Sequence, residues 1–211
     1  MRKRTPAPIY QLKITLRGSK PPIWRRVLVS GHSTLADLHE IIQIVMDWDE
    51  AHLHEFEINK IRYSDPLVAL DGAQNETRVR LKEVISREKM KFHYVYDFGD
   101  DWDHEILVEK ILPPDPEKER ELPVCLKGKR ACPPEDVGGM GGYYYFLEAI
   151  QDPEHPEHEI LSEWIKAAEY FPGEEEDENV SEEAPETPVF DPEFFDLELI
   201  NEFLAKRWPR C

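Results

Sequence analysis

Acidic, aromatic and imidazole side chains are concentrated between Tyr96 and Glu105, in the segment Y-D-F-G-D-D-W-D-H-E. A tight turn needs only one glycine and one aspartate, so the additional carboxylates of this segment are available for other chemistry. Carboxylate oxygens and imidazole nitrogens are ligands for divalent metals, and they also bind polar or cationic partners. The segment therefore indicates either a ligand or metal site or a heavily hydrated turn, and the residue types leave both open.

Two other segments supply groups of the same kind. His52 and His54 fall on the same side of an expected strand as Phe56, and His104 falls on the same side as Ile106. Histidines on an apolar face are usually core residues, but these would form a His/Asp pocket beside the acidic turn if the two strands are neighbours. The candidate binding residues are His52, His54, Tyr96, Asp97, Asp100, Asp101, Trp102, His104, Glu135 and Asp136.

A separate set of residues has the ligand types of a zinc site. Cys125, Cys132, His155 and His158 form the pattern C-x6-C…H-x2-H. Structural zinc sites usually place about 2–4 residues between cysteines and about 3–5 between histidines, so these spacings are unusual. Zinc is the one cofactor that the sequence suggests, with two buried or loop thiols as the alternative interpretation.

Motifs of the common enzyme classes are incomplete. Four histidines precede a glutamate, but none continues to the second histidine of H-E-x-x-H. Asp97-Phe98-Gly99 resembles the magnesium motif of kinases without a glycine-rich phosphate loop or an H-R-D segment, and there is no G-x-S-x-G. The glycine run at 138–142 matches neither dinucleotide nor P-loop patterns. A lone nucleophile at Cys132 with a distant histidine stays open.

The elements that position these residues follow from hydrophobic periodicity. Alternation predicts antiparallel strands over 9–17 and 23–29, and apolar spacing predicts a helix over 35–46 that Ser33 or Thr34 caps. A second hairpin spans 53–63, and a third surrounds the acidic turn. We expect helices over 143–151, 157–170 and within 190–208, and an irregular loop over 122–142.

This order of elements predicts an α+β fold. Its features are a mainly antiparallel sheet, a helix packed across the sheet, a first half with β-grasp-like connectivity, and a helical C-terminal part. The expected organisation is a basic disordered arm at 1–7, one α+β domain at 8–171, an acidic disordered linker at 172–189, and a segment at 190–211 whose helix docks on the domain.

Charge is distributed unevenly along the 211 residues, whose net charge is −18. Residues 1–147 carry 22 basic and 24 acidic side chains, whereas residues 148–202 carry one basic and 20 acidic side chains. Such an acidic region repels phosphate backbones and disfavours nucleic acid as a partner. Three cysteines, no long apolar run and no signal peptide predict a cytoplasmic protein without a membrane partner.

Five segments together carry a family resemblance. They are P-P-I-W-R-R at 21–26, L-A-D-L-H-E-I-I-Q at 35–43, H-L-H-E-F at 52–56, Y-D-F-G-D-D-W-D-H at 96–104 and C-P-P-E-D-V-G-G at 132–139. In this order they resemble the plasmid pRiA ORF-three-like family, also described as insertion-element passenger (TnpR-type) proteins. The likeness runs from Ile9 to Leu204. The acidic stretch at 173–188 lies outside the family pattern, and Val137 stands where many relatives have cysteine.

The resemblance implies no established biochemical function, but it does imply an association with mobile genetic elements. From the residues themselves we predict a noncatalytic binding module that holds a protein partner or small ligand where the 96–104 turn meets the 132–142 loop. One alternative is a metal-assisted hydrolase that uses His54, Asp100, His104 or the cysteine pair. A weaker alternative is an accessory factor in DNA transposition that binds DNA through its N-terminal arm.

Overall fold

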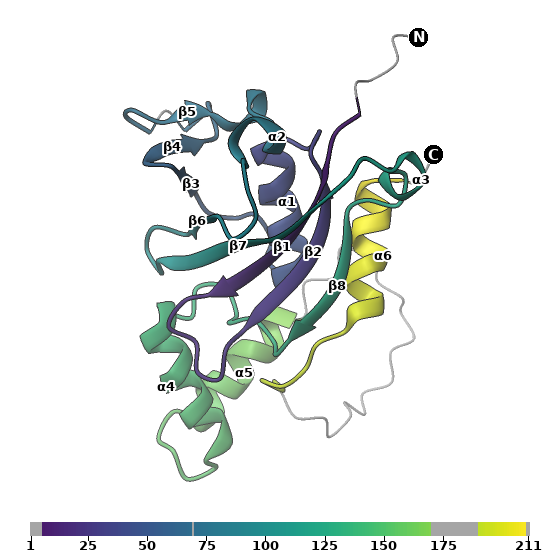
Figure 1. Ribbon diagram of the computed structural model, residues 1–211. Helices are drawn as coiled ribbons and strands as arrows, with labels where there is room; N and C mark the ends of the chain where they lie inside the picture. The colour runs from purple at the N-terminus through teal and green to yellow at the C-terminus, as the bar shows by residue number, and fades with distance from the viewer. Residues whose placement is uncertain (1–5, 69, 170–189, 210–211) are drawn as a thin grey trace, which may run out of the picture.

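A computed structural model describes residues 6–68, 70–169 and 190–209 of the chain. Most of the predicted basic arm, at residues 1–5, lies outside the described residues, and so does the predicted acidic linker at 172–189. The described residues form a curved sheet with helices on one face and at one end (Figure 1).

One eight-stranded sheet contains all the strands, in the order β5-β4-β3-β6-β7-β1-β2-β8. Every neighbouring pair is antiparallel except β4 and β5, which are parallel. The predicted α+β class with a mainly antiparallel sheet is therefore confirmed. The strands are β1 (Ile9–Leu16), β2 (Trp24–Ser30), β3 (His54–Ile58), β4 (Ile61–Ser64), β5 (Gln74–Asn75), β6 (Lys91–Tyr96), β7 (Trp102–Leu112) and β8 (Val124–Lys129).

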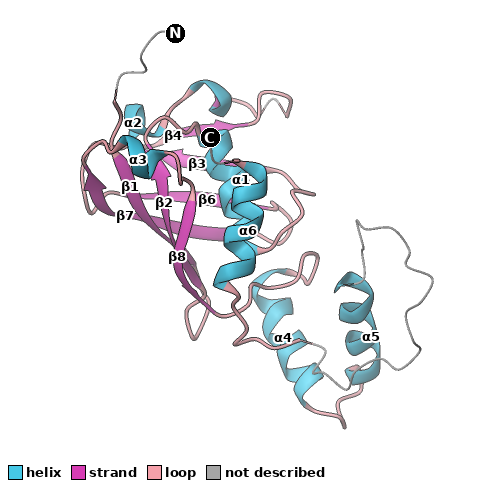
Figure 2. Ribbon diagram, turned by 90° about the vertical axis from the view of Figure 1, so that its right-hand side faces the viewer, coloured by secondary structure: helices cyan, strands magenta, loops and turns pink. Residues whose placement is uncertain are grey.

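The helices divide into two groups. The long helices α1 (Leu35–Met46) and α6 (Leu197–Arg207) lie side by side on one face of the sheet (Figure 2). The helices α4 (Gly139–Gln151) and α5 (His158–Glu169) pack together beyond one end of the strands. The remaining helices are short, namely η1 (Glu76–Arg78), α2 (Leu81–Val84) and α3 (Pro116–Glu119). No helix among the described residues is long and apolar enough to cross a membrane.

Helix α1 starts and stops at residues suited to those positions. Thr34 caps the first turn: its hydroxyl accepts a hydrogen bond from the Asp37 N–H, and the Asp37 carboxylate accepts one from the Thr34 N–H. The helix ends at Asp47, whose left-handed backbone, with φ of 62°, turns the chain away from the helix axis. The end of α1 therefore fixes where residues 48–53 lie.

The two faces of the sheet differ in chemistry. Alternate strand residues point toward α1 and are buried, as the period of two requires. The opposite face carries ion pairs, including Arg17 with Asp103, Lys91 with Glu105, and Arg26 with Glu109. Much of the charge that the sequence places along these strands is neutralised on this face.

The expectation of an irregular loop over 122–142 is wrong at both ends, because strand β8 occupies 124–129 and helix α4 begins at Gly139 instead of residue 143. Prolines and glycines near β8 favour a loop, but its backbone gains hydrogen-bond partners by pairing with the edge of β2. Gly128 leaves room for an aromatic ring, since a Cβ there would lie 2.4 Å from the Phe195 ring. The pairing of β8 with β2 depends on contacts between residues far apart in the sequence, and the local composition of residues 122–142 does not predict such contacts.

Arg25 joins β2, β8, α1 and the loop after β8. It is 2% exposed, and its guanidinium donates to the Val45 carbonyl at 2.6 Å, the Lys129 carbonyl at 3.1 Å and the Cys132 sulfur at 3.1 Å. The Phe195 ring centroid lies 4.6 Å from the guanidinium carbon. A planar group with several fixed donors matches these acceptors, whereas an ammonium group does not.

We expect Arg25→Lys to lower the free energy of unfolding by about 2 kcal/mol, because a lysine leaves buried carbonyls without donors. Urea unfolding followed by circular dichroism measures the change. The control is Arg26→Lys, which alters a half-exposed ion pair with Glu109 and should cost less than about 1 kcal/mol. Equal losses in the two variants would contradict the central role of Arg25.

Candidate functional site: an acidic corner formed by three loops

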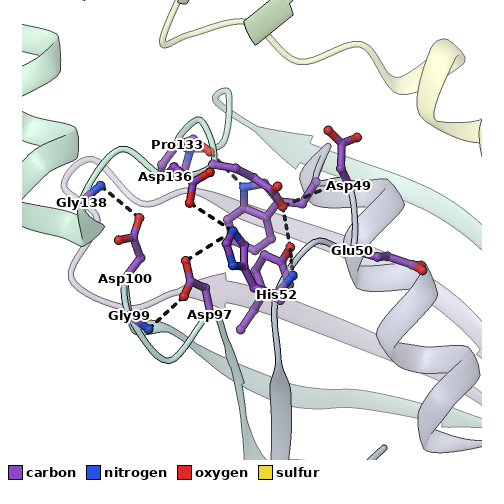
Figure 3. Close-up of polar contacts among 12 residues, drawn as sticks. Asp49, Glu50, His52, Asp97, Gly99, Asp100, Pro133, Asp136 and Gly138 are labelled. Carbon is purple, nitrogen blue, oxygen red and sulfur yellow. Dashed lines mark hydrogen bonds and ion pairs between the residues drawn. The ribbon is translucent and has the colours of Figure 1, made fainter. Parts of the chain in front are cut away.

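Three loops meet at one end of the sheet. They are residues 47–53 between α1 and β3, residues 97–101 between β6 and β7, and residues 132–138 between β8 and α4. We call this region the acidic corner (Figure 3). The predicted meeting of the 96–104 turn with the 132–142 loop is present in the structure, where Asp100 Oδ2 accepts from the Gly138 N–H at 3.0 Å.

The Trp48 and Tyr96 side chains hold the corner together. The Trp48 indole donates to the Pro133 carbonyl at 2.9 Å, and its ring stacks on that of Tyr96, with 5.1 Å between centroids. The Tyr96 hydroxyl accepts from the His52 N–H at 3.3 Å and donates to Glu135 Oε1 at 2.5 Å. Burial and the neighbouring Glu135 carboxylate raise the pKa of Tyr96, so it stays a hydrogen-bond donor.

Asp97 closes the turn that the sequence places at 98–101. Its Oδ1 accepts from the Gly99 N–H at 2.8 Å, and its backbone N–H donates to the Leu53 carbonyl at 2.8 Å. The Asp97 backbone is left-handed, with φ of 54°, which aspartate tolerates better than most residues. The turn is thereby fixed to the loop that precedes β3.

The glycine run at 138–142 allows the third loop to approach the turn. A Cβ at Gly139, whose φ is 67°, would lie 2.5 Å from the Asp100 carbonyl oxygen. A Cβ at Gly142 would lie 1.9 Å from the Val137 carbonyl oxygen. A side chain at Gly139 would therefore push the 97–101 turn away, whereas one at Gly142 would displace the backbone of the 132–138 loop at Val137.

The centre of the corner is a group of one imidazole and two carboxylates. His52 Nε2 lies 3.1 Å from Asp136 Oδ1 and 3.8 Å from Asp97 Oδ2. Figure 3 shows the two carboxylates reaching the His52 ring from different loops. Asp97 is buried and Asp136 is exposed, so the group opens toward solvent on one side.

The carboxylates of the corner lack basic partners within the described part of the chain. Asp97 and Asp136 pair only with His52, whereas Asp103 and Glu105, a few residues farther along β7, pair with Arg17 and Lys91 on the open sheet face. The acidic segment of the sequence is thus split by the fold. The corner keeps uncompensated negative charge, and its three loops also carry Asp49, Glu50, Asp100, Asp101 and Glu135.

His54 does not join the corner, although it lies only two residues from His52. Its ring stacks on that of His39, with 3.4 Å between centroids, and its Nε2 lies 2.9 Å from Glu76 Oε2. His39 Nδ1 in turn lies 2.7 Å from the Tyr94 hydroxyl. This buried network belongs to the contact between α1 and the sheet.

Trp102 and His104 also lie below the surface. Both are essentially fully buried, and the Trp48 ring packs on Trp102 and edge-on against His104. Burial lowers the pKa of His104 to about 4, although backbone groups of Trp102 and Tyr94 oppose the decrease. Neither ring nitrogen has a partner in hydrogen-bonding geometry among the described residues. These side chains support the corner from beneath and do not face solvent.

The four residues of the suggested Cys/His zinc site have separate surroundings. The Cys132 thiol contacts Arg25 and the Met46 sulfur, and burial raises its pKa to about 11. Asn201 binds the backbone of Cys125, the His155 ring packs against Tyr145, and His158 Nδ1 lies 2.9 Å from the Ala149 carbonyl oxygen. Within the described part of the chain, the ligand atoms of these two cysteines and two histidines do not lie close enough together to share one metal ion.

Three comparisons place the chain among other proteins. The sequence profile of the plasmid pRiA4b ORF-3-like protein matches residues 8–199. The chain belongs to this family. An uncharacterized protein, y4hQ of Sinorhizobium fredii (strain NBRC 101917 / NGR234), is 38% identical over 166 residues, which cover 78% of this chain and 84% of that protein. The crystal structure of MM3350, a protein of unknown function from Methanosarcina mazei Go1, matches with a TM-score of 0.74, 36% identity, and coverage of 92% of this chain and 98% of that one.

Membership of the plasmid pRiA4b ORF-3-like family confirms the resemblance inferred from the five sequence segments. Three of these segments, at 52–56, 96–104 and 132–139, contain residues of the acidic corner. Trp48 is a candidate functional-site residue that the sequence patterns did not single out, although its position directly after an amphipathic helix was a usable signal. No local pattern could have paired Glu76 with His54.

Removing one hydroxyl should loosen the corner. In Tyr96→Phe the His52 N–H and the Glu135 carboxylate lose their shared partner, and we expect a loss of about 1–2 kcal/mol in unfolding free energy. Hydrogen exchange in residues 49–52 and 133–138 should become faster while the strands stay protected. Tyr10→Phe is the matched control, since its hydroxyl bonds to the Ile85 carbonyl away from the corner. Unchanged exchange in both loops would contradict the bracing role.

Stability should decrease in mild acid. Burial lowers the pKa of His39 to about 3 and that of His104 to about 4, below the ordinary value of about 6.5. The unfolded chain therefore binds protons as the pH falls below about 6.5 while the folded chain does not, so stability is lost as acid is added. Each histidine contributes up to about 1.4 kcal/mol per pH unit.

Urea unfolding between pH 7.5 and 5 measures this slope, and His104→Leu should reduce it. The control Ile106→Val, a neutral core change in the same strand, should lower stability by about 0.5–1.5 kcal/mol without changing the slope. An identical pH dependence in wild type and His104→Leu would show that His104 does not contribute.

Proposed function

We propose that this protein is a noncatalytic binding module whose recognition surface is the acidic corner. The observation that supports this most strongly is that the carboxylates around the central group, Asp49, Asp100 and Asp101, form no ion pair with a described lysine or arginine. Several carboxylates that lie close together without a lysine or arginine favour a cationic partner, because the partner supplies the positive charge that the protein does not. The chemistry of the corner therefore favours a protein segment that carries lysine or arginine side chains.

Exposed apolar groups beside the carboxylates fit the same role. Phe98 and Leu53 are each 44% exposed, and they lie in two of the three loops of the corner. Asp101, Asp49 and Asp136 are exposed in the same loops. Aromatic and aliphatic side chains next to charged groups are typical of the contact surfaces of binding loops. A basic segment with one apolar side chain matches both features.

The surroundings of the reactive groups favour binding over catalysis. The Cys132 thiol is buried with its pKa raised to about 11, so it is protonated at neutral pH and inaccessible as a nucleophile. His54 is paired with Glu76, and His104 is enclosed beneath Trp48. These positions weigh against the alternative interpretation of the sequence, a metal-assisted hydrolase that uses His54, Asp100, His104 or the cysteine pair. The arm invoked for DNA binding lies largely outside the described residues, and the net charge of −18 opposes that role.

Selection from a random peptide library tests the proposed function. We expect wild-type protein to enrich peptides that contain lysine or arginine near an apolar residue, with affinities that weaken as salt is added. Phe98→Ala/Asp101→Asn should weaken binding of the selected peptides at least about 10-fold. Fluorescence anisotropy with labelled peptides measures the change.

The matched control for this double variant is Tyr145→Ala/Glu105→Gln, which also removes an exposed aromatic ring and a negative charge. Tyr145 lies on α4 and Glu105 on the open sheet face, so peptide binding should be retained. Peptides without a basic residue, or equal binding by the two double variants, would contradict the proposal.

A further inference from the structure

One group of side chains in the acidic corner has the composition of a metal site. Among residues 6–68, 70–169 and 190–209, His52, Asp97 and Asp136 form the one group of at least three histidine, cysteine or acidic residues whose ligand atoms lie within 4.8 Å of one another. A mixed nitrogen and oxygen donor set of this kind suits zinc and similar divalent transition metals.

The distances within the group fit a shared cation. Zinc ligands at about 2.1 Å from the metal lie about 3.0–3.4 Å from one another in tetrahedral or octahedral arrangements. His52 Nε2 and Asp136 Oδ1 are 3.1 Å apart, and His52 Nε2 and Asp97 Oδ2 are 3.8 Å apart. The first distance lies within this range and the second exceeds it, so the Asp97 carboxylate would have to move closer to His52 when the cation binds.

A second observation concerns unsatisfied polar atoms. His52 Nε2 is buried, yet no atom of the described residues lies in hydrogen-bonding geometry with it, including the two nearby carboxylates. Asp97 is 8% exposed; the Gly99 N–H binds its Oδ1, and its Oδ2 lies toward His52. The His52 side chain as a whole is 29% exposed, and its Nε2 lies near both carboxylates without the geometry of a hydrogen bond. A cation between the three groups would give this nitrogen and both carboxylates a directional bond.

We infer that the acidic corner binds one divalent transition-metal cation of the zinc class through His52, Asp97 and Asp136. Each ligand belongs to a different loop of the corner, so the bound cation joins residues 47–53, 97–101 and 132–138. The two carboxylates would balance the charge of a divalent cation, and the imidazole would add a neutral nitrogen ligand. Three protein ligands also leave coordination positions for water or for a group of a partner.

This inference rests on the proposed function and deepens it, because the cation would fix the loops that carry the recognition surface. The outer groups of that surface, including Phe98 and Asp101, are not ligands of the cation. Metal binding and partner binding can therefore be measured with different variants. Loss of one without the other shows which of the two proposals fails.

Isothermal titration with zinc chloride tests the inference, using full-length protein without a histidine tag and freed of metal with a chelator. We expect about one zinc per chain, and binding at least about 10-fold weaker in His52→Ala and in Asp136→Asn. Zinc should also slow hydrogen exchange in all three loops of wild-type protein. Asp136 is exposed, so Asp136→Asn should fold normally, which urea unfolding checks.

The matched control is Asp103→Asn, which removes a carboxylate on the opposite face of the same hairpin and should leave zinc binding unchanged. Phe98→Ala/Asp101→Asn should also bind zinc like wild type. Less than about 0.2 zinc per chain would overturn the inference. Zinc binding that persists in His52→Ala and Asp136→Asn, or that is lost instead in His155→Ala, would also overturn it.

Discussion

Trp48 contacts all three parts of the acidic corner. This residue follows the left-handed Asp47 that ends α1, and its indole packs on Tyr96 and Trp102 while donating to the Pro133 carbonyl. One side chain therefore sets the distances between the end of a helix, the end of a hairpin and a loop from the opposite sheet edge. Large buried aromatic rings contribute strongly to stability, and the indole N–H adds direction to that contact.

The fold sorts charges that the sequence places close together. Asp103 and Glu105 lie on the open sheet face and form ion pairs with Arg17 and Lys91. Asp97 and Asp100 lie in the corner and form no ion pair with a lysine or arginine among the described residues. Neutralised carboxylates on a hydrated face contribute little to stability or recognition. Carboxylates without cations keep their attraction for a positive ligand, and the binding role that we propose rests on this difference between the two sets of carboxylates.

The sequence predicted the parts of the fold that local pattern determines. Alternating apolar residues placed β1, β2, β6 and β7, and helical spacing with Thr34 as cap placed α1. Strand β8 was not predicted, because it forms by pairing with β2 and because the prolines and glycine in and around it are typical of loops. Edge pairing of this kind depends on residues about 100 positions away in the chain, as the pairing of Arg25 with Gly128 shows.

Prediction of the site was limited in the same way. The sequence indicated two segments for the site, namely the turn with its excess of aspartates and the loop near Cys132 that is rich in proline and glycine. The two segments do meet, through Asp100 and Gly138. Parity along the strands placed His54 and His104 on the inner face, but only the fold shows that His54 pairs with Glu76 and that His104 lies under Trp48. His52, Asp97 and Asp136 come together only because the fold places three loops side by side, and no spacing in the sequence predicts this.

The most direct measurement of the central claim is a crystal structure of the full chain soaked with cobalt chloride, with anomalous scattering recorded at the cobalt edge. The account predicts one strong anomalous peak within about 2.3 Å of His52 Nε2, bounded by carboxylate oxygens of Asp97 and Asp136. A peak at Cys125, Cys132 or His155, or three loops too far apart to share one ion, would contradict it.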